Sequence, residues 1–280
     1  MNGGGGEDGV GLFDALVLGL VEGLTEFLPV SSTGHLIVAQ RWLGLGASEA
    51  NNVFAIGIQM GAITAILVLY WQRLVAALRT VLAPRPGHPN LLWQIALAAL
   101  PAALLGLLAD DWIDTHLFSA QVVAVTMVLG GVLLLGLERW LAKGGRTGVE
   151  LDRMPYRTAV YVGLFQCLAL IPGTSRSAAT IGGALLLGLS RTAAAEFSFL
   201  VGLPILYGAS LYKLGKHHEL LAGELLPPFV CGTVVACLCA LVVVRPFVRF
   251  LRDHTFAPFA WYRMVGGLVL LALCLGGVLQ

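Results

Sequence analysis

Two short polar stretches contain side chains that could bind and react with a substrate. The first, EGLTEFLPVSSTGH, covers residues 22–35, and the second, PGTSRS, covers residues 172–177. Between them they supply carboxylates, several hydroxyls, an imidazole and a guanidinium. Such groups serve phosphoryl or acyl transfer. Phosphoryl transfer is favoured, because a guanidinium and paired carboxylates suit a complex of phosphate with a metal ion.

Glu22 and Glu26 form the carboxylate pair. They are four residues apart, so on a helix their side chains share one face. Two carboxylates at membrane depth are costly unless they are paired, protonated or bound to metal. Two explanations stay open: a divalent cation, Mg²⁺ or Ca²⁺, that bridges them to an anionic substrate, or an ion pair with Arg176. The alternative without chemistry is one neutral glutamic acid bonded to the backbone.

The residues after Pro29 predict an anion-binding helix start. Ser31, Ser32, Thr33 and Gly34 would open a short helix, whose first N–H groups and positive dipole end attract anions. Plain N-capping would use the same residue types. The sequence alone does not separate the two roles.

The second stretch repeats this arrangement and adds a cation. Thr174, Ser175 and Ser177 surround Arg176, whose guanidinium can hold a phosphate through two parallel hydrogen bonds. His35 would lie one turn further along the first short helix. A lone histidine is usually structural, but beside these groups it is a candidate base or nucleophile.

The elements that must position these residues are membrane helices. The chain is 58% hydrophobic and only 12% charged, whereas a soluble domain carries about a quarter charged residues. Six apolar runs approach the length that a bilayer core requires. They cover residues 53–71, 91–109, 119–137, 197–212, 227–244 and 264–280. The composition predicts an all-α polytopic membrane protein, and the absence of a basic cluster with interleaved aromatics argues against a nucleic-acid partner.

The placement of Lys and Arg predicts the orientation. Eleven basic residues fall in the loops expected near 72–90, 138–158 and 245–258. Three fall on the other side, together with the acidic stretch DDWID at 110–114, which is expected to be a loop. The basic loops are therefore expected in the cytoplasm and both chain ends outside. This requires that residues 10–45 and 157–190 each return to the side that they entered.

Residues 10–45 and 157–190 each read as a re-entrant helical hairpin. Each consists of two short apolar pieces that are broken at a proline, Pro29 or Pro172. The two segments can be aligned in two ways, with Pro29 on Pro172 or with Gly19 on Gly163. These alignments differ by one residue.

The hairpins open two similar halves of the chain. In both halves three long spans follow the hairpin, and MVLGGVLLLG at 127–136 parallels MVGGLVLLAL at 264–273. Three spans per half is odd, so the two copies must have opposite topology, with their hairpin tips near the membrane midplane. We expect one membrane domain over residues 1–280. It would contain repeat one at 10–140, a cytoplasmic linker at 141–156 and repeat two at 157–280.

The two motifs within inverted halves resemble the bacterial undecaprenyl-diphosphatase family over nearly the whole chain. FQCLALIPG, AEFSFL at 195–200 and LDRMPYR at 151–157 add to the resemblance. It implies a hydrolase that removes one phosphate from undecaprenyl diphosphate, a polyprenyl diphosphate lipid. The reaction recycles the lipid carrier for peptidoglycan synthesis and gives bacitracin tolerance. The resemblance also implies dependence on Mg²⁺ or Ca²⁺, and a site open to the outer face of the bacterial plasma membrane.

The resemblance assigns roles by position. It places Glu22 and Glu26 on the family's acidic pair, Ser32 and His35 on its candidate nucleophile and base, and Arg176 on its phosphate-gripping arginine. The polar groups around the phosphates fall on Ser31, Thr33, Ser175 and Ser177. One position departs from the family, because Ala178 replaces a glycine that usually ends the second motif. We expect this position to be helical, so that alanine fits it.

A transporter or lipid flippase is the alternative from another class, because inverted repeats with broken helices also build secondary transporters. The sequence leaves open the attacking atom, which could be that of Ser32, of His35 or of a water. It also leaves open the metal, the lipid chain length and a homodimer.

Overall fold

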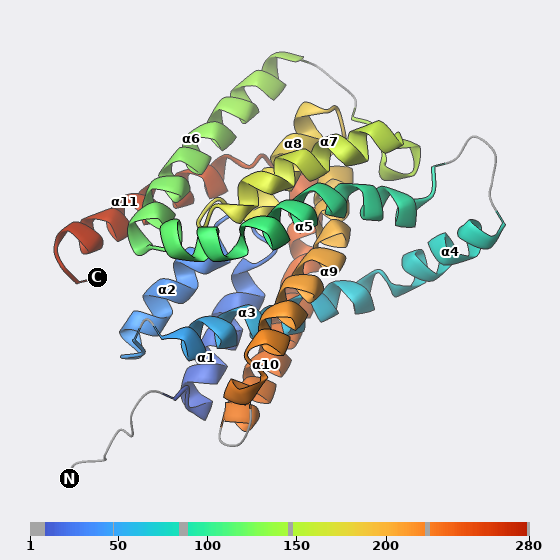
Figure 1. Ribbon diagram of the computed structural model, residues 1–280. Coiled ribbons are helices and arrows are strands. Elements are labelled where there is room, and N and C mark those ends of the chain that lie inside the picture. The colour runs from blue at the N-terminus through green and yellow to red at the C-terminus, as the bar shows by residue number, and fades with distance from the viewer. Residues whose placement is uncertain (1–8, 47, 84–88, 145–147, 222–224, 279–280) are drawn as a thin grey trace, which may run out of the picture.

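The structure is a computed structural model that describes residues 9–46, 48–83, 89–144, 148–221 and 225–278. Within these residues the chain forms α-helices and short 3₁₀ turns, and no β-strand (Figure 1). The helices are α1 (Leu12–Thr25), α2 (Ser32–Trp42), α3 (Glu49–Leu69), α4 (Trp71–Leu82), α5 (Leu91–His116), α6 (Ala120–Gly144), α7 (Tyr156–Gln166), α8 (Arg176–Leu186), α9 (Arg191–Lys216), α10 (Leu226–Asp253) and α11 (Ala257–Leu275). The 3₁₀ turns are η1 (Leu151–Arg153), η2 (Cys167–Leu170) and η3 (His218–Leu221).

Six helices are long and apolar enough to cross a membrane: α3, α5, α6, α9, α10 and α11. Each contains most of one predicted apolar run, so the prediction of six spans is confirmed. The helices extend beyond the runs because charged residues at their ends, such as Arg191 and Lys216 of α9, leave the helical backbone intact. The chain is therefore a multi-pass membrane protein.

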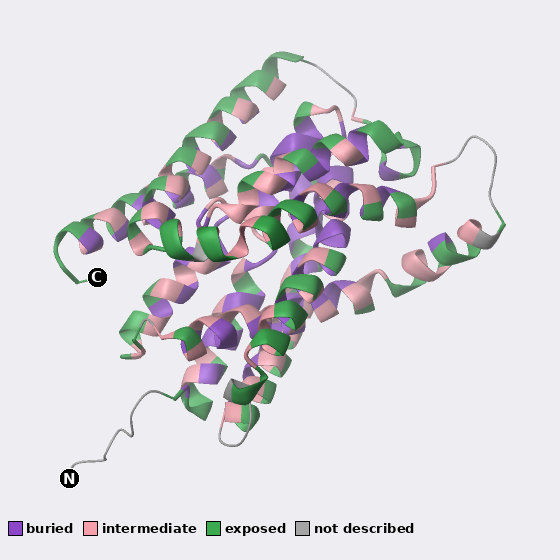
Figure 2. Cartoon of the chain, in the orientation of Figure 1, coloured by how far each residue is buried: buried purple, intermediate pink, exposed green. Residues whose placement is uncertain are grey.

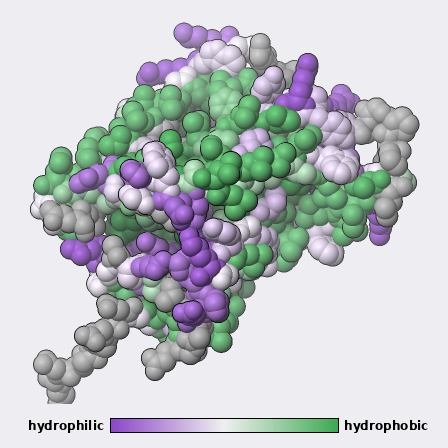
Figure 3. Space-filling model, viewed as in Figure 1, coloured by the Kyte–Doolittle hydropathy of each residue, from purple (hydrophilic) through white to green (hydrophobic). Residues whose placement is uncertain are grey.

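The surface agrees with a lipid environment. Large apolar side chains stand exposed on the spans, among them Leu108 on α5, Leu133 on α6 and Val242 on α10. Figure 3 shows hydrophobic residues over much of the visible face, with hydrophilic ones gathered in patches. Apolar surface of this extent would be costly in water and is favourable against lipid tails.

Two segments that were expected to be loops are helical. Residues 71–82 form α4, which is amphipathic and projects from the bundle at the right of Figure 1. The acidic stretch 110–114 continues α5 to His116. In both segments charged residues had indicated a loop, but none of them breaks a helix, and Leu74 and Leu78 of α4 have the spacing of a helical apolar face.

The predicted hairpin segments contain pairs of short helices. α1 has 14 residues, and α2, α7 and α8 have 11 each. At about 1.5 Å per residue, even α1 is roughly 21 Å long, short of a bilayer core of about 30 Å. None of the four could span a membrane alone.

Glycines let the short helices pack closely against long ones. Gly19 of α1 faces the backbone of Gly232 in α10, and Gly163 of α7 faces the backbone of Ala98 in α5. Gly61 brings α3 equally close to α10. Buried residues concentrate in the middle of the molecule (Figure 2), where α3, α5, α7, α8, α9 and α10 share the main hydrophobic core.

Replacing Gly61 with alanine should destabilise the fold. A Cβ there would lie 3.0 Å from the Cα of Thr233 and closer to its carbonyl, so α3 and α10 must separate. We expect a loss of about 1–3 kcal/mol in the free energy of unfolding, measured in mixed detergent micelles. Gly136→Ala is the control, because a Cβ there meets nothing within 4 Å, and it should be neutral or slightly stabilising. Equal effects of the two substitutions would contradict this account of the contact.

Candidate active site

The two tips between the short helices share an unusual backbone geometry. Ser31 precedes α2 and Ser175 precedes α8, and their φ angles are 72° and 69°. Among the described residues they are the only ones other than glycine with positive φ. Residues other than glycine rarely adopt a positive φ, so the surrounding structure must hold the backbone of each tip in place.

Each of these serines caps the helix that follows it. Ser31 Oγ accepts the N–H of Gly34 at 3.3 Å, and Ser175 Oγ accepts the N–H of Ala178 at 3.2 Å. Other N–H groups of each first turn have no partner within the helix and remain suited to an anion. Ala178 is an ordinary helical residue of α8, which confirms that alanine fits there.

The tips touch each other through hydroxyls. Ser177 Oγ donates to the carbonyl of Leu28 at 2.9 Å, which joins the second tip to the end of the first. Ser175 Oγ lies 3.0 Å from Ser177 Oγ. The two polar stretches, far apart in the sequence, therefore form one cluster.

A buried ion pair lies at the centre of this cluster. Arg176 Nη2 donates to Glu26 Oε1 at 2.9 Å, and only 8% and 6% of the two side chains are exposed. Ser32 Oγ donates to the other carboxylate oxygen at 2.8 Å. The Nη1 group of Arg176 donates to the carbonyl of Ser198 at 2.8 Å, so α9 also fixes the guanidinium. For Glu26, the ion pair is thus the arrangement present.

Glu22 is in a different situation. Its side chain is fully buried, and neither carboxylate oxygen has a hydrogen-bond donor among the described residues. It interacts electrostatically with Glu26 and Arg176. Among the described residues, no three His, Cys, Asp or Glu side chains are close enough to form a complete metal cage. The two unused oxygens of Glu22, beside the Glu26 carboxylate, nevertheless fit a hard divalent cation that takes its remaining ligands from phosphate and water.

His35 is bonded to partners other than Ser32. Its Nδ1 lies 2.7 Å from the carbonyl of Ser31, and its Nε2 lies 2.7 Å from the hydroxyl of Tyr262 on α11. The two rings stack with centroids 5.5 Å apart. In a neutral imidazole Nδ1 must donate to the carbonyl, so Nε2 accepts from Tyr262. The contact of Tyr262 with His35 joins residues that are 227 positions apart in the chain, so sequence spacing did not reveal it.

The remaining predicted residues lie around the tips. Gly34 packs against Met127, whose sulfur would lie 2.6 Å from an added Cβ. The N–H of Thr174 donates to the carbonyl of Ile171. Thr33 lines a cavity of about 390 Å³ that extends to Asp110 of α5.

This cavity has mostly apolar walls between α3, α5 and α9. Pro172 of the second tip lies at the same end as Thr33, and Leu107 and Pro204 form part of the wall. At the far end Lys213 Nζ lies 3.0 Å from Asp110 Oδ1. The cavity therefore connects the tips with the end of the bundle that carries this ion pair.

Arg263 is the polar residue that sequence reasoning missed. Its side chain is fully buried behind the tips, where it donates to backbone carbonyls of both. The signal was present, because Arg263 is a charged residue directly before the apolar segment MVGGLVLLAL. Arg263 lies one residue outside the predicted run 264–280, but it is inside α11, and a charge inside a span marks a functional candidate.

The sequence model of the family described as bacitracin resistance protein BacA matches residues 15–269. The chain belongs to the BacA family. Its relatives include proteins named undecaprenyl-diphosphatase from Acidovorax ebreus, Bacillus subtilis and Nitrosomonas europaea. They are 46%, 43% and 46% identical over 95%, 94% and 96% of this chain, and the matches cover 96%, 98% and 97% of the relatives.

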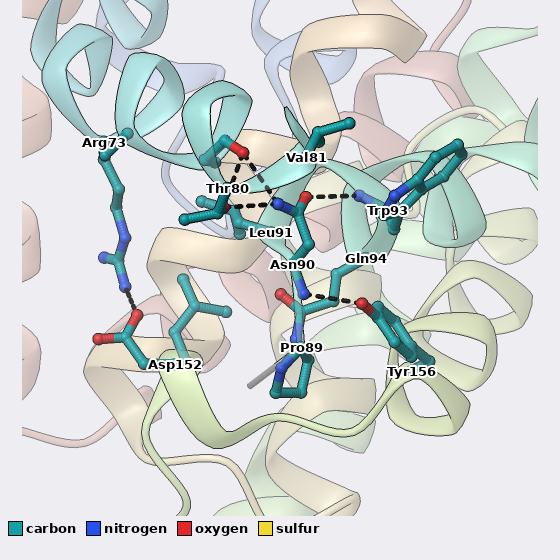
Figure 4. A pocket seen from close by; sticks show the side chains of 13 residues that line it. Arg73, Thr80, Val81, Pro89, Asn90, Leu91, Trp93, Gln94, Asp152 and Tyr156 are labelled. Carbon is teal, nitrogen blue, oxygen red and sulfur yellow. Dashed lines mark hydrogen bonds and ion pairs between the residues drawn. The ribbon is translucent and has the colours of Figure 1, made fainter. Parts of the chain in front are cut away.

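A second cavity of this BacA-family chain has a structural explanation. Figure 4 shows it between α4, α5 and the residues before α7, with a volume of about 630 Å³. Its polar groups are committed to one another: Asn90 Oδ1 caps α5, and Asn90 Nδ2 donates to Thr80 Oγ1 at 2.7 Å. Tyr156 Oη accepts the N–H of Asn90 at 2.8 Å. These bonds hold α4 beside α5 and leave no converging set of reactive groups.

Two ion pairs join the first turns of α9 to other helices. Glu196 accepts a hydrogen bond from Arg73 of α4 at 2.6 Å, while both Nη groups of Arg191 reach Glu138 of α6. Arg191 and Glu196 lie on different faces of α9, so each pairs with another helix.

Removing either partner of the central ion pair should destabilise the protein. Arg176→Met leaves the Glu26 carboxylate buried without its cation, and Glu26→Gln does the reverse, so each should cost about 3 kcal/mol. The double variant should lose at least about 1 kcal/mol less than the sum. Unfolding in mixed micelles measures the cycle.

A matched cycle combines Glu26→Gln with Lys213→Met. Lys213 is about 15 residues, or roughly 22 Å, along α9 from Ser198, so these effects should be additive. Additive effects in the Arg176 cycle as well would contradict a coupled pair.

Proposed function

We propose that the chain is an undecaprenyl-diphosphatase, which hydrolyses undecaprenyl diphosphate to undecaprenyl phosphate and phosphate. The names of its relatives and its family support this function, which recycles the lipid carrier for peptidoglycan and gives bacitracin tolerance. The observation that carries the proposal is the meeting of two capped helix starts at the ion pair between Arg176 and Glu26. Neither the relatives' names nor the site's geometry supports a pure transporter.

The diphosphate would bind between the tips. The first turns of α2 and α8 offer N–H groups and positive dipole ends, and Arg176 offers its guanidinium. Nε of Arg176 is buried without an acceptor among the described residues, so the guanidinium retains an unused donor. The hydroxyls of Ser175, Ser177 and Thr33 would surround the phosphate oxygens.

Glu26 would accept the proton that the reaction releases. Its Oε2 already accepts the hydroxyl hydrogen of Ser32. Two oxygen nucleophiles fit this geometry: Ser32 Oγ itself, and a water that replaces the Ser32 hydroxyl at Glu26. Either would attack the terminal phosphorus, and the bridging oxygen would leave with the lipid phosphate. Attack by water would give phosphate directly, whereas attack by Ser32 would form a phosphoserine that a water must then hydrolyse to release phosphate and restore the hydroxyl. His35 would reach the reaction only after Tyr262 releases its Nε2.

Glu22 and Glu26 are proposed as the residues that would hold Mg²⁺ or Ca²⁺. Such a cation would supply charge neutralisation and polarise the phosphoryl oxygens. The two unpartnered oxygens of Glu22 support this assignment, because a buried carboxylate without donors stays ionised only beside a cation.

The apolar cavity between α3, α5 and α9 would receive the lipid. Its walls suit an isoprenoid chain, and Thr33 and Pro172 place its inner end at the tips. A lipid lying there would present its diphosphate to Arg176. The ion pair between Asp110 and Lys213 would mark the polar mouth.

An inverted repeat over residues 10–140 and 157–280, joined by the linker 141–156, would explain the recurring geometry. The positive φ of Ser31 and Ser175 makes them equivalent, and the same sequence offset relates Gly19 to Gly163. This supports the glycine-based alignment. It sets Glu22 on Gln166.

Packing between the halves also supports opposite topology. α1 packs on α10 as α7 packs on α5, so each hairpin contacts the second span of the other half. Hydrogen bonds join Thr64 with Tyr207 and Ser210 with Ile56, so α3 and α9 lie antiparallel. Equivalent helices of inverted copies must have opposite directions. In this arrangement α1–α2 and α7–α8 are the two re-entrant hairpins, and their tips meet near the midplane.

The orientation follows from the charged ends. Arg245, Arg249 and Glu196 line one cavity at an end of the bundle, and Arg73 pairs with Glu196 there. The positive-inside rule puts this end in the cytoplasm. The end with Asp110 and Lys213, both chain ends and the mouth of the lipid cavity would then face outside.

Purified protein should release phosphate from a long-chain polyprenyl diphosphate, and EDTA should abolish the release. Arg176→Ala should lose at least about 100-fold in rate, because it removes the guanidinium at the transferring phosphoryl group. Detergent-solubilised protein suffices, since hydrolysis needs no gradient. No release by folded wild-type protein with added Mg²⁺ or Ca²⁺ would overturn the proposed function.

Gly202→Ala should lower the rate of phosphate release, although residue 202 acts only through the guanidinium of Arg176. A Cβ at this position of α9 would lie 2.9 Å from Nη1 and 3.0 Å from Cζ of Arg176, so the guanidinium must shift. We expect a fall in kcat of about 10- to 100-fold, the range that displacements near 1 Å produce.

Gly215→Ala on the same helix is the matched control, because Gly215 does not line the cavity proposed for the lipid. A Cβ there meets nothing within 4 Å, so the rate should stay at the wild-type level. If kcat of Gly202→Ala is unchanged, the guanidinium of Arg176 does not act on the reacting phosphoryl group from the position described here.

A further inference from the structure

The guanidinium of Arg263 is a fully buried cation without a carboxylate. No Asp or Glu of the described residues lies within ion-pairing distance of it, and its exposed fraction is 0%. Nη1 donates to the carbonyl of Pro29 at 3.4 Å, and Nη2 donates to that of Gly173 at 3.1 Å. Burying a charge without a counter-ion is costly, so its contacts must compensate for the lost water.

Pro29 and Gly173 are equivalent points of the two tips. Each lies two residues before the serine with positive φ, Ser31 in the first tip and Ser175 in the second. One guanidinium therefore spans the two tips at matching carbonyls. No other described side chain donates to both tips at once.

Helix α6 supplies the other hydrogen-bond acceptors of this guanidinium. Nη2 of Arg263 also donates to the carbonyl of Thr126 at 3.2 Å, and Nε donates to that of Met127 at 3.4 Å. An added Cβ at Gly130 would collide with Nη2, so this glycine provides the space in which the side chain crosses α6.

Thr126 has a related contact with the second tip. Its Oγ1 donates to the carbonyl of Pro172 at 2.7 Å. Thr126 and Arg263 directly precede the two similar segments MVLGGVLLLG and MVGGLVLLAL, so they are also equivalent positions of the two halves. Both copies of this position thus bind tip carbonyls, and only Arg263 reaches both tips.

We propose that Arg263 is a positioning residue that sets the separation of the two tips, so that a diphosphate contacts both at once. This inference rests on the proposed function. Arg263 touches no substrate: its side chain lies behind the tips, and it acts through Pro29 and Gly173. A monophosphate, which needs only one tip, does not depend on this separation.

The test measures kcat, the affinity for a lipid methylene-diphosphonate and inhibition by inorganic phosphate. Arg263→Met should lower kcat by about 100-fold and weaken the diphosphonate by about tenfold or more. Inhibition by inorganic phosphate should change by less than about threefold. Arg263→Lys should be intermediate, because an ammonium has donors for carbonyls but lacks the planar fork.

Arg191→Met is the matched control. Arg191 also has a largely buried guanidinium, but its partner is Glu138 on α6, about 12 residues or roughly 18 Å from Thr126. It should lower thermal stability and keep the ratio of diphosphonate to phosphate affinity.

Each outcome decides the proposal. Equal weakening of both ligands in Arg263→Met, or the same selective loss in Arg191→Met, would overturn it. If Arg263→Met does not fold, Arg263→Lys and Thr126→Val replace it in the test. A wild-type ratio of diphosphonate to phosphate affinity in both variants would overturn the proposal. An inactive wild type would instead refute the proposed function.

Discussion

The arrangement of the whole site depends on one buried ion pair. Arg176 begins α8 and Glu26 follows α1, and their contact joins two segments that are far apart in the sequence. Such a pair inside a membrane protein gains little from its own attraction, because both charges lose their hydration. It persists because Ser32 and Ser198 supply further hydrogen bonds to its free atoms. The fold is therefore constrained to bring α1, α2, α8 and α9 together at this point.

Close helix packing makes this constraint tolerable. Positive φ at Ser31 and Ser175 costs energy, and so does the burial of Glu22 and Arg263. The compensation comes from contacts that only small residues allow, such as those of α1 with α10 and of α7 with α5. Where lipid surrounds a protein, packing and internal hydrogen bonds replace much of the hydrophobic drive, so rigid tips require many such contacts.

The sequence predicted the six spans and the two polar tips because both depend on local composition. Apolar length identifies a span, and a run such as PVSST identifies a helix start. It did not predict which carboxylate meets Arg176, nor the partners of Glu196 and His35, because these depend on contacts between distant helices. The one-residue ambiguity between the halves needed the backbone angles of Ser31 and Ser175. Helix α4 was recognisable from its apolar spacing, but its arginines had suggested a loop.

The balance of charge at the tips bears on the need for a metal. Arg176 pairs with Glu26, Glu22 lies beside them, and Arg263 lies behind the tips without a carboxylate partner. With both glutamates ionised, two positive and two negative charges cancel before substrate enters. A lipid diphosphate brings several negative charges into a space with little water, and helix dipoles offset only part of them. A divalent cation arriving with the diphosphate would restore the balance, and the unpartnered oxygens of Glu22 are the site's unused capacity to bind it. The proposed metal would then serve first to lower the free-energy cost of binding the diphosphate, and its effect on the reacting phosphorus would follow from the same placement.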